Sequence, residues 1–152
     1  MPTRTPPRRW RATGVVEAPV DEVFEQLLTA GIIPPGADRA TARSAAVDAD
    51  GRERFRAPIG DPPVTSVDVE IDRTARTLAV QGHWWYRGVY AVQPHPRGSR
   101  IVYQVHNIAP NASRWVVPLM QFRLASQMRG ELDQLLHTIG ARLGGASDPV
   151  AN

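Results

Sequence analysis

The chain of 152 residues contains no cysteine and no lysine, so all 18 of its basic residues are arginine. The absence of cysteine excludes disulfides, thiolate metal sites and cysteine nucleophiles. The absence of lysine excludes Schiff-base chemistry and the lysine of a phosphate-binding loop. No apolar run approaches the ~20 residues of a membrane-spanning helix, and the N-terminus lacks the apolar core of a secretory signal. We therefore expect a cytoplasmic protein with no membrane span.

Motifs for metals and cofactors are also missing. The histidines do not share the spacing of metal ligands on one helix; they are His83, His95, His106 and His137. The sequence has neither a Gly-x-Ser-x-Gly nucleophile elbow nor a glycine-rich nucleotide loop. This pattern predicts a protein that uses no metal and no cofactor.

Positive charge is concentrated at the start of the chain. The formal net charge is +3, and four of the arginines lie within the first eleven residues. The remainder is close to neutral, whereas a domain that binds nucleic acid carries a basic stripe across its folded face. We expect no nucleic-acid partner. The expected organisation is a disordered basic tail over 1–8, one ligand-binding domain over 9–144 and a disordered tail over 145–152.

Between the tails, apolar residues recur with the periods of strands and helices. The segment 65–72 alternates between β-branched and acidic residues, which is typical of a half-solvated antiparallel strand. Pro19, with Asp21 and Glu22 in the residues after Val20, is typical of a first helical turn. In chain order we expect a strand at 10–17, a helix at 19–29, strands at 41–48, 52–57, 65–72, 77–83, 84–93 and 99–108, and a helix at 113–143.

The expected last helix has one broad apolar stripe. Its members are Trp115, Leu119, Phe122, Met128, Leu132, Leu135, Leu136, Ile139 and Leu143. The solvent-facing side carries Arg123, Glu131 and Arg142, and two glycines follow the helix. Antiparallel strands followed by one such helix predict an α+β fold. A curved sheet of about seven strands would wrap around the C-terminal helix and leave a cavity between them.

Two segments carry a recognisable pattern. One is Val-Glu-Ala-Pro-Val-Asp-Glu-Val-Phe at 16–24, and the other is Gly-Ser-Arg-Ile-Val-Tyr at 98–103. Together with the order of elements, these segments resemble those of the START-like helix-grip superfamily (SRPBCC). Members of this superfamily commonly have Gly-Thr-Arg-Val where this chain has the segment that begins at Gly98. This superfamily contains polyketide cyclases and dehydratases, lipid carriers and plant pathogenesis-related proteins. The resemblance implies a helix-grip fold over about 10–143, but it does not name a reaction, because the superfamily has no shared catalytic motif.

Strand parity indicates which side chains face the cavity, because side chains alternate along a strand. The more aromatic face of the first aromatic strand carries Trp84, Tyr86 and Tyr90. Tyr103 and Asn107 share a face of the next strand. We expect these five side chains to line one pocket. The opposite parity would instead place the other faces of the two strands in the cavity, with Trp85, Arg87, Gln104 and His106. His106 would then be the acid–base candidate, and Arg87 would anchor the ligand.

The candidate catalytic residues are Tyr86, Asn107 and Arg129. A phenol can stabilise an enolate through a hydrogen bond, and an amide can orient a substrate oxygen. The resemblance implies a cavity arginine, since aromatic-polyketide cyclases hold a polyketone chain beside tyrosines in this way. Arg129 borders the helix stripe, whereas Arg54 and Arg56 face solvent if Phe55 points inward. The candidate ligand-binding residues are Phe55, Trp84, Tyr90, Tyr103, Leu119 and Phe122.

Two functions from different classes fit this expected cavity. The first is a cofactor-independent enzyme of secondary metabolism that cyclises, dehydrates or isomerises a hydrophobic oxygenated molecule, as polyketide cyclases and dehydratases do. The second is a carrier or sensor of a lipid-like ligand, in which the tyrosines serve only packing. We favour the first, because the expected cavity face is more polar than a plain lipid tunnel. The expected partners are the hydrophobic ligand and a second copy of the chain in a homodimer.

Overall fold

The structure is a computed structural model that describes residues 9–34, 47, 49–60, 64–82, 86–107 and 117–150, with side chains at all of these except 9, 107 and 117–125. The elements in chain order are β1 (Arg9–Val16), α1 (Val20–Thr29), β2 (Arg52–Ile59), β3 (Thr65–Asp72), β4 (Thr77–Gln81), β5 (Tyr86–His95), β6 (Gly98–Asn107), α3 (Val117–Leu143) and β7 (Ser147–Val150). Neither of these helices is long and apolar enough to cross a membrane, as far as the described residues go.

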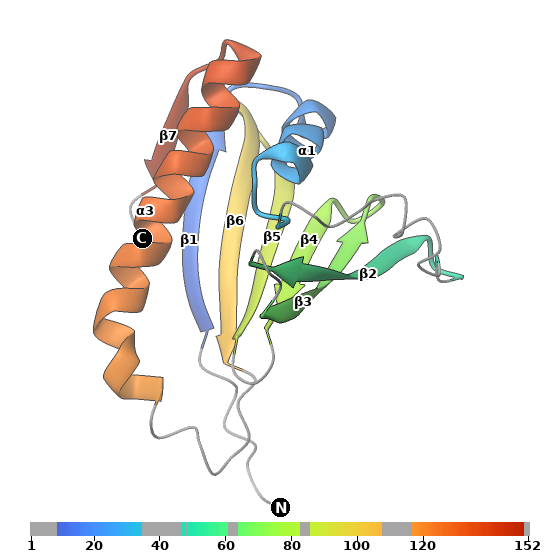
Figure 1. The fold of residues 1–152 in the computed structure, drawn as a ribbon. Coiled ribbons are helices and arrows are strands. Elements are labelled where there is room, and N and C mark those ends of the chain that lie inside the picture. The colour runs from blue at the N-terminus through green and yellow to red at the C-terminus, as the bar shows by residue number, and fades with distance from the viewer. Residues whose placement is uncertain are drawn as a thin grey trace, which may run out of the picture.

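One antiparallel sheet forms the body of the molecule. Its strand order is β2-β3-β4-β5-β6-β1-β7, and each neighbouring pair is antiparallel. The long helix α3 runs along β1 and β7, the short helix α1 contacts β5 and β6, and β2, β3 and β4 lie on the side away from α3 (Figure 1). This arrangement confirms the predicted α+β helix-grip fold.

The buried face of α3 is the predicted apolar stripe. Leu143 is half-buried and packs against the core cluster that α3 forms with α1 and the sheet. The other described members are buried within this cluster: Met128, Leu132, Leu135, Leu136 and Ile139. Leu136 lies against Gly14 of β1, where an added Cβ would lie 2.2 Å from its Cδ1. Because glycine has no side chain, the helix can pack close to the sheet at this point.

The two segments that carry the resemblance meet at one end of the sheet. The buried Ser99 donates a hydrogen bond of 2.6 Å from its Oγ to the carbonyl oxygen of Ala18. Gly98 has φ +127°, and a Cβ there would lie 2.7 Å from the backbone oxygen of Val16 and the backbone nitrogen of Ala18. Only glycine fits both the conformation and the space. The turn between β5 and β6 thus fixes the position at which α1 begins.

The C-terminal strand differs from the expectation of a disordered tail over 145–152. Ser147–Val150 pair with β1 as an edge strand. An ion pair of 2.8 Å between Asp148 and Arg97 joins this strand to the turn between β5 and β6. The sequence Ser-Asp-Pro-Val has no apolar alternation, and Pro149 is tolerated because the strand lies at the edge. Strand β7 is stabilised by backbone pairing with β1 and by the ion pair with Arg97, which is distant in the sequence. Neither interaction can be recognised from the sequence of the strand itself.

The other strand boundaries lie close to their predicted positions. The expected strand at 41–48 lies outside the described residues, apart from Val47, which forms an isolated bridge with Glu53. Strand β2 continues through Pro58 to Ile59, beyond the predicted end at 57. This extension is possible because β2 is an edge strand. Proline has no backbone N–H, and at a sheet edge no neighbouring strand needs that donor.

Candidate functional site

The three tyrosines of the chain form one cluster on the helix-facing side of the sheet. Tyr90 and Tyr103 are paired across β5 and β6, and their rings stack with centroids 4.2 Å apart and planes 4° apart. The hydroxyl of Tyr86 lies 2.7 Å from that of Tyr103, and either can be the donor. These contacts confirm the predicted parity for the tyrosine cluster, Tyr86, Tyr90 and Tyr103.

A glycine gives Tyr86 the room to reach its partner. A Cβ at Gly88 would lie 2.5 Å from the hydroxyl oxygen of Tyr86 and 3.3 Å from Cε2 of Tyr103. The side chain of Tyr86 therefore passes over Gly88, and any larger residue there would displace the phenol. Gly88 is a positioning residue that our sequence analysis missed. Its place between two tyrosines on one strand face is the signal that could have identified it.

Burial keeps the phenols of the tyrosine cluster neutral. Burial is the largest of the effects that raise the pKa of Tyr86, Tyr90 and Tyr103 above the ordinary value for tyrosine. A neighbouring phenol and the negative charge of Glu131 raise the pKa of each further. A neutral phenol both donates and accepts hydrogen bonds. The cluster can therefore bind a carbonyl or hydroxyl oxygen, but it cannot act as a base near neutral pH.

Tyr86 and Tyr90 line a cavity of about 410 Å³ between the sheet, α3 and the segment after α1, whereas Tyr103, which was also expected there, is not among its lining residues. We call it the tyrosine cavity. Its other lining residues come from β4, from the segment after α1 and from α3: Val80, Ala30, Gly31, Ile32, Glu131, Gln134, Leu135 and Thr138. A concave surface that combines apolar walls with a few polar groups is typical of sites for small molecules.

Glu131 is the lining residue for which our sequence analysis expected a purely solvent-facing position. Its exposed side chain lies at the rim of the tyrosine cavity and accepts a hydrogen bond of 3.1 Å from Nε2 of Gln127. Glu131 precedes the buried Leu135 by about one helical turn, so it borders the apolar stripe. Among the described residues, no three His, Asp or Glu side chains gather in a way that could hold a metal ion.

Arg129 lies away from the tyrosine cavity. Its exposed side chain lines a second depression of about 340 Å³, together with Thr13 of β1, Asp133 of α3 and Val150 of β7. The structure therefore does not bring Arg129 together with Tyr86. Its position gives no support to the cavity-arginine role that the resemblance implied.

The remaining predicted site residues are only partly described. Phe55 is half-buried and packs against the core, but it does not line the tyrosine cavity. Asn107 is directly opposite Tyr86 in the pairing of β5 and β6. The side chains of Asn107, Leu119 and Phe122 lie outside the described residues, as does the whole of Trp84.

The outer face of the sheet carries Arg54, Arg56 and Arg87, of which the alternative parity would have placed Arg87 inside. Arg54 and Arg56 form ion pairs of 3.0 and 2.9 Å with acidic residues directly opposite on β3. Arg87 donates a hydrogen bond of 3.0 Å to Gln81, which is opposite to it on β4. His106 is opposite Arg87 on β6 and therefore shares that face. The alternative parity is thus excluded.

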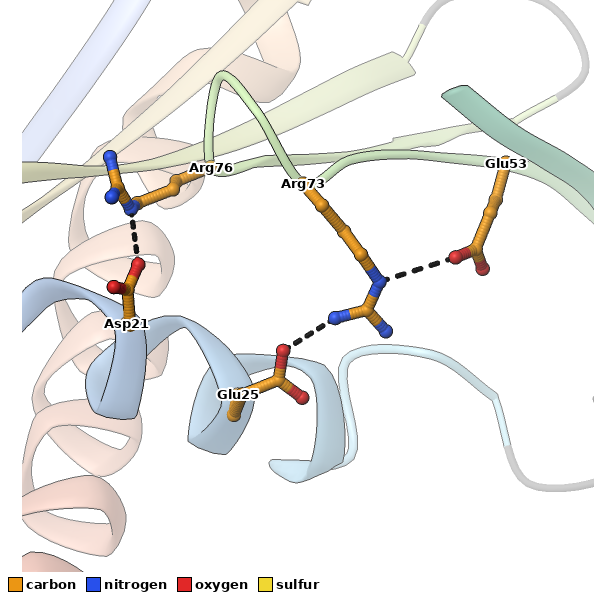
Figure 2. A network of polar contacts seen from close by, with 5 residues as sticks. All are labelled: Asp21, Glu25, Glu53, Arg73 and Arg76. Carbon is orange, nitrogen blue, oxygen red and sulfur yellow. Dashed lines mark hydrogen bonds and ion pairs between the residues drawn. The ribbon is translucent and has the colours of Figure 1, made fainter. Parts of the chain in front are cut away.

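A network of ion pairs links the helix α1 to the sheet (Figure 2). The segment directly after α1 forms one wall of the tyrosine cavity. Arg76 pairs with Asp21 at 2.7 Å, and Arg73 lies between Glu25 and Glu53. Both arginines belong to the turn between β3 and β4, so the network joins α1 to this turn and to β2. Exposed pairs of this kind contribute at most ~1 kcal/mol each. Their main effect is to orient α1 over the sheet.

We expect the folded protein to show no tyrosinate absorbance at pH values just above the ordinary pKa of tyrosine, because the pKa of every tyrosine is raised. Unfolded tyrosines ionise near pH 10. The stability that comes from the neutral cluster is therefore complete below about pH 10 and is lost as the pH rises further. Near-ultraviolet absorbance and circular dichroism, followed together in an alkaline titration, should change at the same pH. A phenol that ionises near pH 10 in the folded state would contradict this.

Comparisons with known proteins identify similar structures but no similar sequence. No protein-family model and no curated protein matches the chain. A polyketide cyclase-like protein from Corynebacterium glutamicum has 14% identity and a TM-score of 0.53, with 91% of each chain covered. The Zhui aromatase/cyclase from Streptomyces sp. R1128 has 16% identity and a TM-score of 0.52, with coverage of 90% of this chain and 95% of its own. A protein from Thermus thermophilus has 17% identity and a TM-score of 0.50, with coverage of 89% and 99%. At such identities the likeness establishes a shared fold.

Proposed function

We propose that this chain, which has the helix-grip fold of the START-like superfamily, binds a hydrophobic oxygenated small molecule in the tyrosine cavity and promotes its cyclisation, dehydration or isomerisation. The observation that carries the proposal is that the neutral phenols of Tyr86 and Tyr90 line a cavity of about 410 Å³, together with both apolar and polar residues. The similar fold of an aromatase/cyclase supports it. The polar groups would hold the ligand oxygens while the walls bury its carbon skeleton.

The chemistry would use Tyr86 and Glu131 from two walls of the cavity. The Glu131 carboxylate takes a proton from the carbon next to a ligand carbonyl. The enolate oxygen that forms accepts a hydrogen bond from the Tyr86 phenol, which stabilises the developing negative charge. In a dehydration, the protonated Glu131 then gives the proton to a departing hydroxyl group, so water leaves and the carboxylate is restored. Binding in a folded conformation would bring the reacting carbons together.

A carrier without catalysis is the second candidate, and one observation favours it. The hydroxyls of Tyr86 and Tyr103 bond to each other, and the ring of Tyr103 is covered by Tyr90. Tyrosines in a protein core often pair in this way for structural reasons alone. In a carrier, Tyr86 would only orient a ligand oxygen, and Glu131 would take no proton.

The test uses acetylnaphthalene, an aromatic ketone with exchangeable protons next to its carbonyl. We expect Tyr86→Phe to weaken its binding about fivefold, because one hydrogen bond contributes ~1 kcal/mol. We also expect the variant to slow protein-promoted exchange of these protons for deuterium about a hundredfold. Calorimetry measures the binding, and proton NMR measures the exchange. The matched control is Arg87→Gln, since the neighbouring side chain faces the outer side of the sheet.

Three outcomes separate the candidates. Binding together with exchange that depends on Tyr86 supports the enzyme. Binding to the wild-type protein without any accelerated exchange rejects the enzyme and supports the carrier. If the ketone does not bind, or if Arg87→Gln weakens its binding as much as Tyr86→Phe, the tyrosine cavity is not the ligand site.

A further inference from the structure

The described lining of the tyrosine cavity contains one charged residue, and it is negative. Among the described residues that line the cavity, Glu131 carries a carboxylate, and the others are apolar or neutral. We propose that Glu131 makes the cavity selective for aromatic ligands that carry a protonated amine, against carboxylates of the same size. This inference rests on the proposed function only in that the cavity must bind a ligand. It adds the charge class of that ligand.

The nearby arginines do not offset this negative charge. Arg73 and Arg76 are paired with carboxylates of α1 and β2 (Figure 2). Arg142 donates to the carbonyl oxygen and to the hydroxyl of Thr29, at 3.4 and 3.3 Å, at the end of α1. None of these three lines the tyrosine cavity. A ligand carboxylate would therefore meet a like charge at the rim without a basic partner among the described lining residues.

The rest of the lining suits a cation. Tyrosine rings attract ammonium groups through their negative faces, and Tyr86 and Tyr90 both line the cavity. Neutral phenols also accept hydrogen bonds from an ammonium group. The attraction between Glu131 and a cation is reduced by water at the rim, but it increases where a bound aromatic ring displaces that water. The site thus combines a carboxylate, phenol oxygens and aromatic surface.

The experiment compares three probes with one naphthalene ring and different end groups: naphthylethylamine, naphthylethanol and naphthylpropanoate. We expect the wild-type protein to bind the amine about tenfold more tightly than the carboxylate. Glu131→Gln should reduce this ratio to within about twofold and should leave the affinity for the alcohol within about twofold. The control variant is Asp133→Asn, because Asp133 lies on the same helix but lines the other depression, with Arg129. This control carries the same change in net charge.

The outcomes distinguish this inference from the proposed function. If the alcohol binds but Glu131→Gln leaves the amine-to-carboxylate ratio unchanged, the charge selectivity is refuted and the binding function stands. If Asp133→Asn reduces the ratio as much as Glu131→Gln, the preference comes from overall charge and the inference is also refuted. If none of the probes binds to the wild-type protein, the proposed binding function is refuted, and the inference with it. A reduced ratio in Glu131→Gln alone supports it.

Discussion

Replacement of Leu136 by alanine should lower the free energy of unfolding by about 2–5 kcal/mol, as is typical of a leucine removed from a tightly packed core. Leu136 is 1% exposed and belongs to the main core cluster. Its side chain fills the space above Gly14, where the helix is closest to β1. The truncation would leave a cavity at the contact that joins helix and sheet, and the backbone on both sides is too regular to collapse into it.

Chemical denaturation of the purified variant measures this effect. The matched control is His137→Ala, at the next position of α3, where the side chain is exposed. A surface substitution of this kind should change stability by less than about 0.5 kcal/mol. If Leu136→Ala costs no more than His137→Ala, the packing of α3 against β1 differs from that described here.

Replacement of Gly98 by alanine should cost about 3 kcal/mol or more, from two separate causes. The backbone at Gly98 has φ +127°, and holding a residue with a side chain in such a region costs ~1–3 kcal/mol. The added Cβ would also lie within 3 Å of backbone atoms of Val16 and Ala18. Because backbone atoms cannot rotate away as a side chain can, the turn would have to move, as in an overpacked core.

A second glycine separates these two causes. Gly51 also has positive φ, +74°, but nothing lies within 4 Å of the position of its Cβ. Gly51→Ala should therefore show only the conformational cost, ~1 kcal/mol. Denaturation curves of the two variants under the same conditions give the comparison. Equal losses would mean that the turn between β5 and β6 does not press against the start of α1.

Local pattern was enough to predict most of the fold. Strand β3 was predicted with its observed limits, because Thr65–Asp72 alternates along its whole length. The end of α3 was marked by Gly144, which adopts φ +66° directly after the helix. The parity of the two aromatic strands followed from the same alternation, and it placed Tyr86, Tyr90 and Tyr103 on one face. In each case the information lies within a few neighbouring residues.

The features that were not predicted depend on contacts between distant segments. Strand β7 exists because β1 offers it an unpaired edge. The place of Glu131 at the cavity rim depends on how α3 is rotated over the sheet, which a division into polar and apolar helix faces does not give. Arg129 borders the same stripe, yet it lines another depression, for the same reason. The two residues are two positions apart on α3, so they lie on opposite sides of the stripe and line different depressions.

The strand order also has a consequence for biosynthesis. Strand β1 pairs with β6 and β7, which are both made much later. Val16 at the end of β1, for example, pairs with Ser99 near the start of β6. The hairpins from β2 to β6 join neighbours in the chain and can form while translation continues, but β1 must wait with both edges unpaired. An unpaired strand is a site for aggregation, and closing so long a loop slows folding. A nascent chain of this topology therefore keeps its first strand without a partner until β6 has emerged from the ribosome.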